Sequence, residues 1–281
     1  MKNDKNRKRL FLAIWFFLIA VIIIGIMVLW PPEEKYETIR EVMKDGVLHE
    51  YNKMQMFGME VNPGLVSAYT VTGILLTTAA LIRIFAIPKF EIIQGKFQSV
   101  LEKLVEFFRD MANANSHHKP AFVGAYIFSA GVYIFFSTVF ELFGIQAVTV
   151  SGHSMSLPAP ISDINAAIAL GVMSYGVILI AGIWCNGVRG ALGVLKDFSL
   201  PVSMSFRLFG ALLSGLLVTE LVYYYVGLSF VLPVIVGVLF TLLHAVIQTY
   251  VLATLVSIFY GEAVEPKPEK VKSKRKGLAK N

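Results

Sequence analysis

Long apolar runs alternate with short polar segments along the whole chain. The runs cover about residues 10–30, 63–87, 121–143, 164–185, 200–226 and 230–260. Each has at least the roughly 20 residues that a helix needs to cross about 30 Å of hydrocarbon. Because a helix satisfies its own backbone hydrogen bonds in lipid, the pattern predicts an all-α integral membrane protein with about six transmembrane helices. The last two runs predict a long C-terminal helical hairpin that turns near Gly227.

One segment between the second and third runs has a different pattern. Apolar residues recur every three or four positions from residue 93 to residue 111, and charged residues occupy most of the other positions. This spacing predicts an amphipathic helix. We expect this helix to lie in the plane of the inner membrane surface, or against a partner, and not to span the membrane.

The composition excludes a soluble protein. The chain has 281 residues, of which 56% are hydrophobic and 16% are charged, and its mean hydropathy is +0.67. A soluble domain of this length does not need so much apolar surface. The formal net charge of +6 comes from Lys and Arg residues at the ends of the runs and in the tail. That distribution indicates membrane topology and not a nucleic-acid partner.

The basic residues also predict the orientation of the chain. They place both termini in the cytoplasm and the acidic segment 31–62 outside. The first run is about 20 residues long and lacks a small-residue cleavage site, which favours a retained anchor over a cleaved signal peptide. We expect an N-terminal anchor helix and acidic external loop over residues 1–62, a membrane domain over 63–262, and a basic cytoplasmic tail over 263–281.

The sequence contains no pattern typical of an enzyme. Cys185 is the single cysteine, which excludes an internal disulfide and a cysteine metal cluster. We expect no catalytic residue, no metal and no cofactor. No internal repeat relates the apolar runs, which argues against a secondary transporter built from paired halves.

Arg207 lies inside the fifth apolar run, roughly 10 Å from its cytoplasmic end. Burying such a charge costs on the order of 3 kcal/mol, so it should face a cavity or a partner carboxylate, unless it reaches the headgroups. Small residues share its helical stripe, which permits either packing within the chain or close approach of a partner helix. They are Ser203, Gly210, Ala211, Ser214 and Gly215.

Further polar residues lie along the expected hairpin. Gln248 is expected at the depth of Arg207, and His244 about 6 Å along the hairpin from it. His244 suits either a hydrogen-bonded structural role or a proton relay. Glu220 lies about 20 Å beyond Arg207, towards an outer vestibule. The acids that end neighbouring runs on that side are Glu141 and Asp163.

Four separated motifs resemble those of subunit a of the F-type rotary ATP synthases. They occur in the order of that family and cover roughly residues 63–262. The most specific is Arg207-Leu208-Phe209-Gly210, within PVSMSFRLFG at 201–210. The others are AVIQTYV at 245–251, GKFQ at 95–98, and residues 158–170, which include Asp163 and Asn165.

The resemblance implies a non-catalytic, ion-conducting stator subunit whose C-terminal hairpin faces a rotating ring of c subunits across two half-channels. Arg207 would displace the ion from each arriving ring carboxylate and block a leak, with Gln248 beside it. The further residues expected to carry ions are Glu220, His244, Asp163 and Asn165. The implied partners are the c-ring, peripheral-stalk b subunits, the other synthase subunits and the lipid of a prokaryotic plasma membrane.

Several positions depart from the family's pattern. Ala211 stands where the family has asparagine, and Leu216 where it has an acid, with Glu220 one turn beyond. Thr241 stands at its histidine position, with His244 one turn nearer the glutamine. The first run is an addition to the common five-span form. We favour protons as the coupling ion. The alternatives are a sodium-coupled subunit, a standalone secondary transporter and a non-conducting scaffold.

Overall fold

The structure is a computed structural model that describes residues 14–17, 21, 53–56, 58–116, 119–150, 154–224 and 232–266. Most of these residues are helical, which agrees with the all-α prediction. The long helices are α3 (Pro63–Leu81), α4 (Lys96–Asn115), α5 (Pro120–Phe140), α6 (Ile164–Leu195), α7 (Ser199–Tyr224) and α8 (Leu232–Val264). The short helical segments are η1 (Ile82–Ala86), η2 (Ile87–Lys89), η3 (Glu141–Phe143) and η4 (Pro160–Ser162).

Four helical segments in the described ranges are long and apolar enough to cross a membrane. They are Pro63–Lys89, Pro120–Phe143, Ile164–Leu195 and Gly237–Val264. These correspond to the second, third, fourth and sixth apolar runs, and α7 covers most of the fifth. The turn near Gly227 and nearly all of the first run lie outside the described residues. The total of about six spans therefore stays a prediction.

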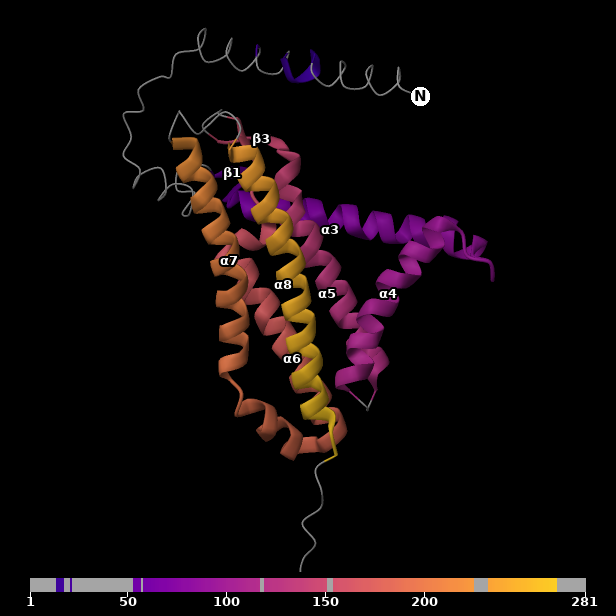
Figure 1. Ribbon diagram of the computed structural model, residues 1–281. Coiled ribbons are helices and arrows are strands. Elements are labelled where there is room, and N and C mark those ends of the chain that lie inside the picture. The colour runs from indigo at the N-terminus through magenta and orange to yellow at the C-terminus, as the bar shows by residue number, and fades with distance from the viewer. Residues whose placement is uncertain are drawn as a thin grey trace, which may run out of the picture.

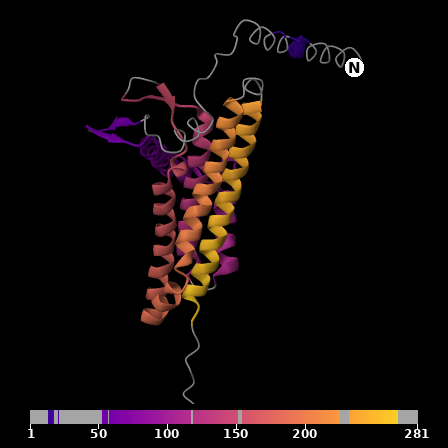
Figure 2. The same cartoon turned by 90° about the vertical axis from the view of Figure 1, so that its left-hand side faces the viewer.

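Helix α8 packs against most of the other long helices. It contacts α4, α5, α6 and α7, and Figures 1 and 2 both show α7 and α8 side by side. Helix α3 runs crosswise to this group in Figure 1 and is seen nearly end-on in Figure 2. Helix α8 has 33 residues, so it is about 50 Å long and must tilt to fit within about 30 Å of hydrocarbon.

Two hydrogen bonds hold α5 and α8 in antiparallel register. Thr249 Oγ1 donates to Gly131 O over 3.2 Å, and Tyr260 OH donates to Lys119 O over 3.3 Å. A Cβ at Gly131 would lie 2.7 Å from the ring of Phe108 on α4, so glycine permits this close packing. The same interface buries the apolar side chains Ile127, Ile134, Leu252 and Val256.

The amphipathic helix is confirmed as α4, although it begins at Lys96 and not near residue 93. The preceding loop is held by Gln98, whose Oε1 accepts from Glu91 N–H and whose Nε2 donates to Glu91 O and Glu102 Oε1. Only part of the predicted apolar face is packed: Phe108 is buried, whereas Phe97 and Val100 are exposed. Its position at a membrane surface stays a prediction.

Two small β-hairpins were not predicted. Strand β1 (Met54–Met56) pairs with β2 (Met59–Val61), and β3 (Gln146–Val148) pairs with β4 (Ser154–Ser156). The hairpins are linked by a hydrogen bond from Val150 N–H to Lys53 O at 3.0 Å. Three-residue strands are too short to produce a recognisable alternation of apolar and polar residues, which is why the sequence pattern did not reveal them.

Helix α6 contains a sharp reversal at Gly187. This residue has φ 59° and ψ −145°, a conformation that side chains disfavour. The following segment packs back on α6, where Tyr175 OH donates to Val194 O over 3.2 Å. Gly190 has no room for a Cβ because the carbonyl oxygen of Gly182 occupies that position. The predicted span thus ends close to Cys185 as expected, but the chain after it forms a separate helical segment.

Candidate functional site

Arg207 lies on an exposed face of α7. It shares this face with Ser203, Gly210 and Ser214, which are also exposed and follow one another at helical spacing. We call these four residues the α7 strip. A Cβ at Gly210 would meet no atom within 4 Å, so the space over the strip is open. Ala211 and Gly215, also expected on this stripe, are only half-exposed. The strip is therefore not used for packing within the described part of the chain.

Gln248 and Arg207 line the same narrow cavity between α7 and α8. The cavity is lined by Met204, Arg207, Leu208, Gln248, Val251, Leu252 and Leu255. The Gln248 side chain is only 6% exposed, and its Oε1 atom has no hydrogen-bond partner in the described structure. A buried acceptor without a donor costs about 1–3 kcal/mol. Such a group is expected where a water molecule or another chain completes the site.

The contacts between α7 and α8 set the distance from Arg207 to His244. Gly215 adjoins His244, so Arg207, eight residues earlier in the antiparallel pair, is level with about Leu252 and about one turn, roughly 6 Å, from Gln248. The Cβ position of Gly215 lies 3.9 Å from His244 Nδ1. Because Gly215 is about 12 Å beyond Arg207 along α7, His244 lies about twice as far away as expected.

His244 and Glu220 lie nearer to each other along the hairpin than to Arg207. Glu220 follows Gly215 by five residues in α7, a rise of about 7.5 Å. Its side chain lies outside the part that the structure describes. His244 is half-buried, and its Nδ1 atom lies 2.8 Å from Phe240 O. The structure thus places this pair nearer than the Arg207 cavity to the end of α7 at Tyr224 and the start of α8 at Leu232.

Asp163 and Asn165 lie at the start of α6, outside the Arg207 cavity. Asp163 Oδ1 accepts hydrogen bonds from Asn165 N–H at 2.9 Å and from Asn165 Nδ2 at 3.1 Å. The start of α3 adjoins this cap, since Asp163 Cβ lies 3.2 Å from the Cβ position of Gly64. The carboxylate is therefore placed near two helix N-termini, whose dipoles favour a negative charge.

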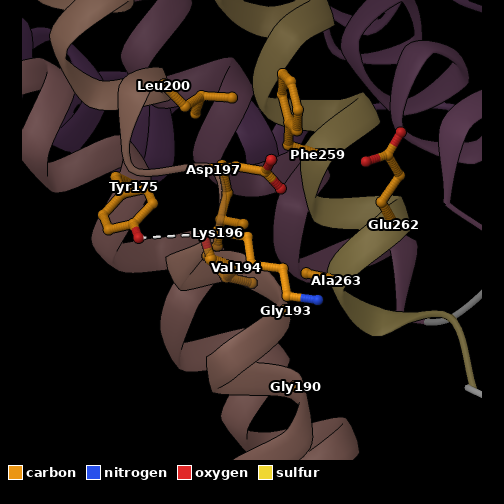
Figure 3. A pocket seen from close by; sticks show the side chains of 11 residues that line it. Tyr175, Gly190, Gly193, Val194, Lys196, Asp197, Leu200, Phe259, Glu262 and Ala263 are labelled. Atoms are coloured by element: carbon orange, nitrogen blue, oxygen red, sulfur yellow. Dashed lines mark hydrogen bonds between the residues drawn. The ribbon is translucent and has the colours of Figure 1, made fainter.

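A second, larger cavity lies where α6, α7 and α8 meet near the Gly187 reversal (Figure 3). Its volume is about 260 Å³. The carboxylates of Asp197 and Glu262 point into this space, while Tyr175 forms one wall and Lys196 extends along another. The sequence pattern did not identify this site, because its residues come from three helices. The closely spaced Gly187, Gly190 and Gly193 were the only local signal of an unusual backbone.

The matching family model is that of the ATP synthase A chain, over residues 66–261, which is more than half of the protein. The chain belongs to the ATP synthase A chain family. This confirms the resemblance and identifies the protein as an ion-translocating subunit of the membrane sector of an ATP synthase. The matched region of this A chain contains the α7 strip, Gln248 and both cavities, apart from Glu262 and Ala263 at the edge of the second.

Proposed function

We propose that the chain is the stator that passes protons through two half-channels to and from a rotating ring of c subunits. The observation that carries this proposal is the exposure of Arg207 on the α7 strip, with no carboxylate of the described residues within 4 Å of it. A cation in a membrane needs water or a counter-charge. A carboxylate on a ring helix that packs on the small residues of the strip supplies that counter-charge.

Arg207 acts on the ring carboxylate through its charge. A fixed guanidinium favours the ionised form of an approaching carboxylate and so lowers its pKa. The proton leaves on one side of Arg207, and the carboxylate is protonated again only after it has moved past. The membrane potential contributes about 2.3 kcal/mol per charge per 100 mV, which drives rotation in one direction.

The half-channels approach Arg207 from opposite ends of α7 and α8. On the outer path we place His244 and Glu220, which are separated by about 7.5 Å along the hairpin, with Asp163 and Asn165 at the entry. On the inner path we place the cavity of Asp197 and Glu262. The unpartnered Gln248 Oε1 supports this arrangement, because it can accept a hydrogen bond from water next to Arg207.

The proposal includes the partners and the location expected from the sequence. The c-ring packs on the α7 strip, the b subunits and other synthase subunits complete the complex, and the chemistry of ATP takes place on those other subunits. The membrane is the plasma membrane of a prokaryote, with both termini in the cytoplasm.

Replacement of Arg207 tests this function. In membrane vesicles that contain the complete synthase, Arg207→Ala should abolish ATP-driven proton pumping. Arg207→Lys should not pump either, because lysine lacks the planar guanidinium that binds a carboxylate through two hydrogen bonds. The matched control is Arg83→Ala, which removes an exposed arginine next to α3 and should leave pumping intact. Normal pumping by Arg207→Ala would refute the proposal.

The coupling ion is tested separately. Pumping by the normal complex should proceed at neutral pH without added sodium. A strict requirement for sodium would show that sodium, and not the proton, is the transported ion. The proposed role of Arg207 would be unchanged.

A further inference from the structure

The segment after the Gly187 reversal presents an apolar stripe away from the other helices. Gly190 and Val194 face inward against Gly182. Val188, Leu192, Leu195 and Phe198 are between 49% and 77% exposed. The spacing of Val188, Leu192 and Leu195 places them along one side of the helical segment, and Phe198 follows in the turn before α7. This side is not covered by any residue that the structure describes.

Two cations border this stripe on the same flank. Arg189 and Lys196 are seven residues apart, which is about two helical turns, and both are exposed. Neither has a carboxylate oxygen of the described residues within 4 Å. An apolar stripe bordered by cations is typical of a helix that lies in a membrane interface and binds anionic headgroups.

The neighbouring part of α6 marks the level of that interface. Trp184, one turn before the reversal, is 77% exposed, and Lys119 Nζ lies 5.5 Å from the centre of its ring. Tryptophan is enriched at the boundary between hydrocarbon and headgroups. Near this end of α6, the apolar residues Ile180 and Ile183 are also exposed. Figure 1 shows the connection between α6 and α7 lying crosswise at the lower end of the helices.

We propose that residues 188–198 form an in-plane anchor, whose apolar stripe enters the leaflet at the end of α6 and whose Arg189 and Lys196 bind the phosphate of an anionic phospholipid. Lipid is the occupant that fits, because the stripe lies at the end of a membrane-spanning helix, beside the exposed Trp184, and its flanking charges match phosphate. The anchor also fixes the start of α7 and hence the position of the α7 strip. Lys196 also lines the cavity placed on the inner ion path, so the test below measures contact with lipid and not ion transport.

A fluorescent label on this stripe tests the anchor in the complete synthase. In a Cys185→Ser background, Leu192→Cys is labelled, and the complex is reconstituted in phosphatidylcholine vesicles with equal amounts of either brominated phosphatidylglycerol or brominated phosphatidylcholine. We expect both brominated lipids to quench the label and phosphatidylglycerol to quench it several-fold more. In the Arg189→Gln/Lys196→Gln variant, quenching by phosphatidylglycerol should fall to the level of phosphatidylcholine.

The matched control removes two cations elsewhere, in Arg83→Gln/Lys89→Gln at the end of α3, and should keep the preference. Equal quenching by the two lipids in the otherwise unchanged chain would overturn the phosphate site. A label that neither lipid quenches would overturn the anchor. In that case dithionite shows what covers the stripe, since it reduces a label exposed to water and spares one buried under a protein partner.

Discussion

Arg207 and Gln248 face the same narrow cavity, but the arginine is exposed on the α7 strip and the glutamine is buried between α7 and α8. The exposed Arg207 is therefore accessible to the second chain proposed above, whereas Gln248 is enclosed between the two helices. The Oε1 atom of Gln248 accepts no hydrogen bond from the described residues, so it does not stabilise the contact between the two helices. A substitution of Gln248 can therefore change ion transport without destabilising the fold.

Gln248→Leu should lower proton pumping without lowering stability. The leucine has a similar volume and removes a buried acceptor whose burial costs about 1–3 kcal/mol, so the chain should be as stable or more stable. Loss of a hydrogen bond to a charged or water-linked group should reduce ATP-driven pumping about tenfold. The measurements are proton uptake by vesicles and thermal unfolding of the purified complex. Unchanged pumping would show that the Gln248 amide has no role.

Gly261→Ala should destabilise the contact between α4 and α8. The carbonyl oxygen of Asn115 occupies the position of a Cβ at Gly261, so the helices must separate, at a cost of about 1–3 kcal/mol. The matched control is Gly237→Ala on the same helix, where a Cβ meets no atom within 4 Å. This control should be neutral or stabilising by up to about 1 kcal/mol. Thermal unfolding in detergent compares the two variants, and equal stabilities would contradict the packing described.

Tyr126→Phe should remove a hydrogen bond that joins α5 to α6. The Tyr126 hydroxyl lies 2.8 Å from Ser174 Oγ, which also donates to Leu170 O. The loss should lower the free energy of unfolding by about 1 kcal/mol. Ser174→Ala should lower it by less in the Tyr126→Phe variant than in the unchanged chain. Tyr69→Phe, on the exposed side of α3, serves as the control. Fully additive effects would mean that the two hydroxyls do not interact.

Continuous apolar runs allowed close prediction of the long helices. The run at 230–260 became Leu232–Val264, and the run at 200–226 became Ser199–Tyr224. Their approximate lengths are set locally, by the extent of the apolar runs. The shared face of Arg207 and the small residues was also predictable, since helical spacing alone determines which residues share a face, whereas the exposure of that face was not.

The register of α7 on α8 and the Gly187 reversal were not predictable in this way. A symmetric turn at Gly227 would have placed Gln248 level with Arg207, whereas the packing around Leu252 shifts the two helices by about one turn. At Gly187 the neighbouring Asn186 and Arg189 mark the end of the apolar run, but they do not predict that the chain turns back on itself. The reversal depends on the contact of Gly190 with Gly182, which is a tertiary interaction.

Cross-linking from the α7 strip tests most directly whether Arg207 faces another chain. In a Cys185→Ser background, Gly210→Cys places a thiol in open space one turn from Arg207, and the control Val172→Cys places one on an exposed part of α6. After treatment of native membranes with a short photoactivatable reagent, mass spectrometry identifies the attached molecule. We predict that position 210 attaches to a ring subunit close to its membrane carboxylate and that position 172 does not. Attachment of position 210 only to lipid, or to this chain alone, would contradict the account.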